Sequence, residues 1–163
     1  GAEIELVNRE NRENILTSAL NGVRDEFEFV IIDCPPSLGL LTLNALAISC
    51  SVLIPMQCEY YALQGLSHLL KTLKLVKKSI NQNLVVEGIL LTMYDSRTLL
   101  AAQVKDQVQK YFSDFLLKTI IPRNVRLSEA PSHGKPIMLY DGRSTGADSY
   151  VELAKEIISR SKS

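Results

Sequence analysis

The residue of this sequence with the clearest chemical potential is Asp33, a carboxylate at the end of an apolar run. Residues 29–32 read Phe-Val-Ile-Ile, and two prolines follow Cys34. An unbroken apolar run is typical of a parallel strand buried on both faces, and the prolines predict a loop directly after it. Ligands of open α/β sheets bind at the carboxyl ends of strands, where an acidic side chain can hold Mg²⁺ beside a phosphate. The alternative is an ordinary strand whose last aspartate caps the loop.

The elements that would position Asp33 alternate between strands and helices. Further strands are predicted over residues 51–56, 85–93 and 117–121. Helices are predicted from Asn11 or Asn14 to Arg24 and over residues 40–48, 62–78, 99–112 and 146–160, and a long irregular connection over residues 122–143. Strands that alternate with helices form a parallel sheet, so we expect one α/β domain spanning residues 1–163.

Composition narrows the classes of protein that fit this chain. Its formal net charge is zero, with 46% hydrophobic and 22% charged residues, which is a globular profile. Nucleic-acid binding would therefore need a local basic patch. Lys71, Lys74 and Lys78 share one face of a predicted helix, a pattern more often of a solvated face than of a DNA contact. The three cysteines lack metal-type spacing and are expected to be small buried thiols. No apolar run is long enough for a membrane span.

Four longer blocks of sequence extend the interpretation beyond single residues. They are DCPPSLGLLTLNA from Asp33, PMQCEYYALQG from Pro55, LLTMYDSRT from Leu90 and IPRNVRLSEAPSHGKPI from Ile121. With these blocks the chain resembles the ParA/Soj-type chromosome and plasmid partition ATPases, which belong to the deviant Walker A group together with MinD. The resemblance covers residues 2–158. It implies a doubly wound, mostly parallel sheet with helices on both faces, as in P-loop NTPases.

The family's phosphate-binding loop, K-G-G-x-G-K-[ST], is absent from this sequence. No Gly-x-Gly occurs, and the only Gly-Lys pair, Gly134-Lys135, precedes Pro136. Backbone N–H groups of such a loop cradle phosphates, and its lysine reaches them. We therefore expect an incomplete fold, the carboxy-terminal part of a larger ATPase, with negligible hydrolysis by this chain alone. The missing strand would leave an apolar sheet edge that invites pairing with another chain.

The resemblance assigns roles to particular residues. Asp33 would hold Mg²⁺ through water, and Pro35, Pro36, Ser37 and Gly39 would belong to a switch segment that responds to the γ-phosphate; an ordinary strand-to-helix turn also explains them. Pro122, Arg123 and Asn124 would border the adenine of ATP. Arg97 and Arg126 would contact DNA phosphates, although pairing with Asp95 and Glu129 on an ordinary surface explains them equally.

The implied function is partition of chromosomes or plasmids. In this interpretation ATP and Mg²⁺ bring about a homodimer on non-specific double-stranded DNA, and a ParB-type partner protein stimulates hydrolysis. Such a protein would be cytoplasmic and nucleoid-associated, without membrane contact. The first alternative is a truncated, non-catalytic module that binds DNA or a partner protein. A MinD-like membrane regulator is disfavoured, because residues 157–163 are too short and too polar for a membrane-binding helix.

Overall fold

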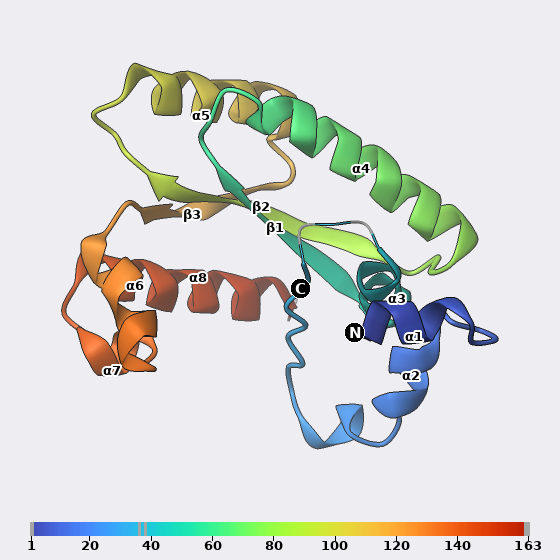
Figure 1. The fold of residues 1–163 in the computed structure, drawn as a ribbon. Coiled ribbons are helices and arrows are strands. Elements are labelled where there is room, and N and C mark those ends of the chain that lie inside the picture. Colours follow the sequence, from blue (N-terminus) through green and yellow to red (C-terminus); the bar gives the residue numbers. More distant parts are fainter. Residues whose placement is uncertain (1, 36, 38, 162–163) are drawn as a thin grey trace. The chain divides into compact units, whose positions relative to one another are not determined.

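A computed structural model describes residues 2–35, 37 and 39–161 of the chain (Figure 1). The residues fall into two compact units, and each is described by itself. The first unit comprises Gly1–Val52 and Leu70–Val85, and the second comprises Leu53–Leu69 and Val86–Ser163.

The second unit contains most of a three-stranded sheet in the order β1-β2-β3. The strands are β1 (Ser51–Gln57), β2 (Val85–Tyr94) and β3 (Leu116–Pro122). β2 and β3 run parallel, with Ile89 opposite Leu116 and Tyr94 opposite Pro122. The three strands lie where the apolar runs predict them. However, β1 is at an edge of this sheet, so Ile54 and Met56 are buried while Leu53 is 37% exposed.

Helices lie on both sides of this sheet, as the fold class predicts. Figure 1 shows α5 (Leu99–Phe112) and α8 (Thr145–Ser161) on opposite sides of β3. Leu153 of α8 packs in one core cluster with Leu90, Leu117 and Ile121. Because side chains alternate along a strand, the fully buried Ile89 and Leu91 point to the other face of β2. The amphipathic helices thus bury both faces of the central strand.

The connection after β3 is more ordered than the sequence suggests. It contains α6 (Val125–Glu129), the 3₁₀ helix η2 (Ala130–His133) and α7 (Ile137–Tyr140), so the expectation of an irregular connection was wrong. Leu127 packs against a small core formed by Ala130, Ile137 and Ala147. Gly134 ends η2 with a φ of 62°, a left-handed conformation that favours glycine. Proline and glycine here mark the ends of short helices rather than a lack of structure.

The first unit is built from short helices and the carboxy-terminal half of α4 (Ala62–Ser79). The others are α1 (Ala2–Val7), α2 (Ile15–Ala19), the 3₁₀ helix η1 (Arg24–Glu26) and α3 (Leu40–Ile48). Buried Asn44 of α3 accepts a hydrogen bond from Leu16 N and donates one to Arg12 O. The single helix predicted up to Arg24 was wrong: α2 ends at Ala19, and the left-handed Gly22, with a φ of 90°, lies between α2 and η1.

The strand predicted around Asp33 does not form. Residues 29–35 have no regular secondary structure, and Val30 and Ile31 are 45% and 92% exposed. A strand needs a hydrogen-bonded neighbour, and the phosphate-loop strand expected beside this one is not encoded in the sequence. The expected burial of the three cysteines was also wrong: Cys34 lies in this exposed segment, Cys50, just before β1, is exposed as well, and Cys58 is only half-buried.

Candidate nucleotide and nucleic-acid site

The carboxyl ends of β2 and β3 lie side by side and carry half of the predicted site residues. Tyr94 is in register with Pro122, and the Arg123 N–H donates to Tyr94 O over 2.9 Å. Just before this contact Met93 has a φ of 49°, a conformation that costs a non-glycine residue about 1–3 kcal/mol. Nothing in the sequence signals that strain. The two loops that contain Arg97 and Asn124 therefore begin at one edge of the sheet, as parallel strands predict.

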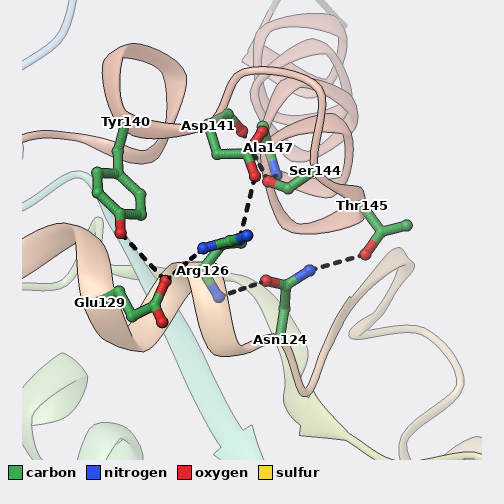
Figure 2. Close-up of polar contacts among 8 residues, drawn as sticks. All are labelled: Asn124, Arg126, Glu129, Tyr140, Asp141, Ser144, Thr145 and Ala147. Atoms are coloured by element: carbon green, nitrogen blue, oxygen red, sulfur yellow. Dashed lines mark hydrogen bonds and ion pairs between the residues drawn. The ribbon is translucent and has the colours of Figure 1, made fainter.

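Asn124 uses its side-chain amide to hold the backbone in place. Its Oδ1 accepts from Arg126 N over 2.8 Å and so caps α6, while its Nδ2 donates to Thr145 Oγ1 over 2.8 Å (Figure 2). The end of β3 is thereby connected to the start of α8. An amide has two donor hydrogens and two acceptor positions, so one of each is left for a ligand. The contact predicted for this residue with adenine remains a prediction.

Arg126 lies between two carboxylates. Its Nη1 is 3.0 Å from Glu129 Oε2, and its Nε is 3.3 Å from Asp141 Oδ2 (Figure 2). Tyr140 also donates to Glu129 over 3.1 Å. The hydrogen bond from Arg126, followed by that from Tyr140, holds the pKa of Glu129 below its ordinary value, and the same ion pair raises the pKa of Arg126. The guanidinium is therefore oriented and largely neutralised in this conformation.

Arg97 is paired in a similar way but with a single partner. Its Nε and Nη2 donate to the two oxygens of Asp95 over 2.9 and 2.7 Å, a bidentate arrangement. The Arg97 side chain is nevertheless 85% exposed. Its hydrogen bonds hold the pKa of Asp95 well below the usual range. Thr98 caps the following helix, α5, by accepting a hydrogen bond from Ala101 N. DNA contact by Arg97 and Arg126 remains a prediction, and both arginines have carboxylate partners.

Asp33 is the predicted metal ligand and belongs to the first unit. Its side chain is exposed, and among the described residues it makes no hydrogen bond or ion pair. Mg²⁺ keeps several waters and takes one or two carboxylates together with substrate phosphates. A free carboxylate of this kind fits one place in that shell. Within the part of the chain that the structure describes, no three His, Cys, Asp or Glu side chains gather as a metal site. Asp33 would therefore need the nucleotide phosphates as further ligands.

The predicted switch segment follows Asp33. Pro36 lies outside the described residues, and Pro35 and Ser37 are exposed. The Thr42 hydroxyl donates to Ser37 O over 2.6 Å. Gly39 precedes the first turn of α3, where Glu3 Oε1 accepts from Leu40 N over 3.0 Å. A Cβ at Gly39 would overlap the Glu3 carboxylate, so a larger residue there would displace the end of this flexible side chain. The role of the segment as a switch remains a prediction.

An open cavity of about 580 Å³ lies beside the end of β1. It is bordered by Gln57, Glu59 and the first turns of α4. Tyr60 and Tyr61, which are 77% and 73% exposed, meet edge to face there with ring centroids 5.0 Å apart. The available signal was the block PMQCEYYALQG, whose tyrosines follow directly after a strand.

Comparisons with known proteins assign the sequence of this chain to a family. Residues 1–86, more than half of the chain, match the protein family described as an AAA domain. The sporulation initiation inhibitor protein Soj of Bacillus subtilis is 63% identical over 157 residues, which cover 96% of this chain and 62% of that protein. The chromosome partitioning protein ParA of Myxococcus xanthus is 59% identical over 98% of this chain and 56% of its own length. The chain belongs to the Soj/ParA family.

Solved structures share the fold of this chain. Cobyrinic acid a,c-diamide synthase from Mycobacterium smegmatis, with bound ADP and magnesium, matches with a TM-score of 0.80 and 37% identity over 100% of this chain and 59% of that one. The cell division ATPase MinD of Pyrococcus furiosus matches with a TM-score of 0.72 and 25% identity, over 90% of this chain and 58% of its own. The chain thus spans about 60% of the relatives it matches.

One further finding concerns membranes. Among the described residues, none of the helices is long and apolar enough to cross a bilayer.

Proposed function

We propose that the protein containing this segment is a DNA-partition ATPase. It binds ATP with Mg²⁺, dimerises on non-specific double-stranded DNA, and hydrolyses ATP when a ParB-type partner stimulates it, in the bacterial cytoplasm at the nucleoid. The observation that carries the proposal is the 63% identity to Soj over 96% of the chain. The activity is a proposal for the whole protein, because the segment spans 62% of that relative.

Asp33 and the loop after β3 are proposed to serve the nucleotide. The exposed Asp33 carboxylate would hold Mg²⁺ through water, and the metal when bound would neutralise charge on the phosphates. Pro122, Arg123 and Asn124 would border the adenine. Asn124 is fixed by Arg126 N and Thr145, so its remaining donor and acceptor are already oriented before any base arrives. Pro35, Pro36, Ser37 and Gly39 would respond to the γ-phosphate.

Arg97 and Arg126 are proposed to contact DNA phosphates. Each would have to exchange a carboxylate for a phosphate, since Arg97 is paired with Asp95 and Arg126 with Glu129 and Asp141. Phosphate contacts require charge and reach but no base recognition, which suits binding without sequence preference. These arginines would therefore bind DNA only in a conformation in which they have released their carboxylate partners.

The chain by itself is proposed to hydrolyse ATP negligibly. Phosphoryl transfer depends on positioning and charge stabilisation by the phosphate loop and its lysine, and the sequence contains neither. Of the proposed nucleotide site, the sequence contains the Asp33 carboxylate and the loop that we propose to border the base.

ATP turnover tests the proposed function. The full-length protein should hydrolyse ATP faster when duplex DNA and a ParB-type protein are both added, and this 163-residue chain should show no turnover above the buffer background. Turnover by the chain alone at the full-length rate would contradict the assignment of the catalytic loop. Absence of stimulation in the full-length protein would contradict the partition function.

The absence of the phosphate loop favours a second candidate, a non-catalytic module that binds DNA or a partner protein. Salt-dependent binding of duplex DNA by this chain without nucleotide would support the module. Binding that appears only in the full-length protein with ATP would support the ATPase.

A further inference from the structure

Helix α4 presents a stripe of lysines that has no role in the function proposed above. Lys71, Lys74 and Lys78 are exposed, and at 100° per residue they fall within an arc of about 60°. The opposite side of the helix carries the buried Leu73 and Val76. We call Lys71, Lys74 and Lys78 the α4 lysine stripe.

The α4 lysine stripe lacks the carboxylates that accompany basic residues elsewhere in the molecule. The 18 residues of α4 include no Asp or Glu. Among the described residues, no ion pair involves any of the three lysines. By contrast, Lys155 and Arg160 of α8 pair with Glu152 and Glu156 on their own helix. Ordinary solvated helix faces mix the two signs of charge in this way.

The helix dipole explains only part of this pattern. Cations in the last turn of a helix are favoured by its negative end, which accounts for Lys77 and Lys78. The effect falls off within one turn, so it does not explain Lys71 and Lys74. The chain has zero net charge, and yet four positive charges are gathered on the second half of α4. Such segregation of charge is typical of a surface that meets a polyanion.

From this charge pattern we infer that the α4 lysine stripe is a second DNA-binding surface, which contacts the phosphate backbone of duplex DNA. The stripe extends about 10 Å along the helix, a length comparable to the width of a DNA groove. Its lysines have no ion-pair partner among the described residues, so they can meet phosphates without first leaving a carboxylate, unlike Arg97 and Arg126. The inference rests on the proposed function only in taking duplex DNA as the partner.

The apolar residues of α4 favour DNA over an anionic membrane. A helix that lies in a membrane interface inserts a continuous apolar face into the lipid. In α4 that face is used by the fold, since Leu66, Leu73 and Val76 are buried. Leu75, which is 66% exposed, is the large apolar side chain left beside the stripe. One leucine provides little insertion, whereas phosphate contacts need only the lysines.

The test measures binding of the full-length protein to a random-sequence duplex, with and without ATP–Mg²⁺, across a salt series. The variants are K71Q/K74Q/K78Q, the control K77Q on the same helix, and R97A/R126A. Three lost phosphate contacts should make the slope of log affinity against log salt shallower by about 2.7. Between about 50 and about 200 mM salt, the affinity ratio of wild type to triple variant should then shrink about 40-fold. Lys77 lies about 60° outside the stripe, so K77Q should change the slope much less.

The outcomes separate this inference from the proposed function. If R97A/R126A abolishes ATP-dependent binding while the triple variant matches wild type in affinity and slope, the lysine inference is overturned and the ATPase stands. If the triple variant loses binding that never depended on nucleotide, the stripe is supported and the nucleotide-controlled function is overturned. Equal losses in K77Q and the triple variant overturn the stripe in favour of general charge. Binding to phosphatidylserine vesicles that the triple variant loses, with unchanged DNA binding, overturns it in favour of a membrane.

Discussion

Two segments are predicted to border the same nucleotide, and they differ in the local contacts that stabilise them. The segment after β3 contains a hydrogen-bonded cap on Asn124, an ion-pair cluster around Arg126 and a small apolar core at Leu127. The segment of residues 29–35 has no regular structure and exposes Ile31 and Asp33. Local capping and packing are sufficient for short helices, whereas a strand depends on neighbours that other parts of a protein must supply.

If the segment after β3 is tightly packed, adding a side-chain atom there should give the largest loss of stability among these substitutions. A Cβ at Gly146 would lie 2.7 Å from Leu127 Cγ, so Gly146→Ala should destabilise the fold by about 1–3 kcal/mol. Gly65→Ala is the matched helical control, because a Cβ there meets nothing within 4 Å and should stabilise α4 by up to about 1 kcal/mol. Urea unfolding measures both. Equal effects of the two substitutions would show that the packing around Gly146 is loose.

The cap on α6 should have the next largest effect. Asn124→Ala removes the acceptor for Arg126 N and the donor to Thr145, and should cost about 1–2 kcal/mol. Asn124→Asp keeps the cap oxygen and loses only the donor, so its loss should be about half as large. Thermal unfolding of the two variants compares them. An aspartate variant as unstable as the alanine variant would show that the Thr145 contact, and not the cap, holds the segment.

The sequence predicts the parts of this fold whose signal is local. Continuous apolar runs correctly locate β1, β2 and β3, and helical spacing correctly locates α3, α4 and α5. The segment after β3 was missed because Pro131 and Gly134 suggest irregular structure, while the contacts that order it join residues far apart in the chain, such as Asn124 and Thr145. The segment before Asp33 was missed for the opposite reason: its apolar run is real, but a strand also needs a partner.

The candidate site was predictable to a similar degree. Parallel strands correctly predict that the loops after β2 and β3 begin together, as the contact of Arg123 with Tyr94 shows. The spacing of residues in the sequence could not show that Asp141 lies with Glu129 beside Arg126, because this contact depends on how α6 and α7 pack.

Acid should weaken the ion-pair cluster of the ordered segment. Glu129 has a lowered pKa, so it favours the folded state above the ordinary carboxyl pKa, and that contribution is lost as the pH falls through its folded pKa. Wild type should therefore lose more stability than Glu129→Gln as the pH is lowered from about 5 to about 3. Because the pair is exposed, the difference should be small and should shrink in salt. Parallel acid dependence in the two proteins would show that the pair contributes nothing.

The smallest effect on stability is expected at Asp33. Its exposed carboxylate makes no hydrogen bond or ion pair among the described residues, so Asp33→Asn should change the free energy of unfolding by less than about 0.5 kcal/mol. Urea unfolding beside Asn124→Ala gives the direct contrast between the two segments. A loss as large as that of Asn124→Ala would mean that Asp33 is part of a folded core.

The most direct test of this account is the ATP dependence of DNA binding in the full-length protein, with the wild type and the neutral isosteric variant Asp33→Asn compared at equal salt. The account predicts that ATP–Mg²⁺ tightens duplex binding of the wild type and that Asp33→Asn, while equally stable, loses this gain. An Asp33→Asn protein that still responds fully to ATP–Mg²⁺ would contradict the assignment of Asp33 to the metal and nucleotide.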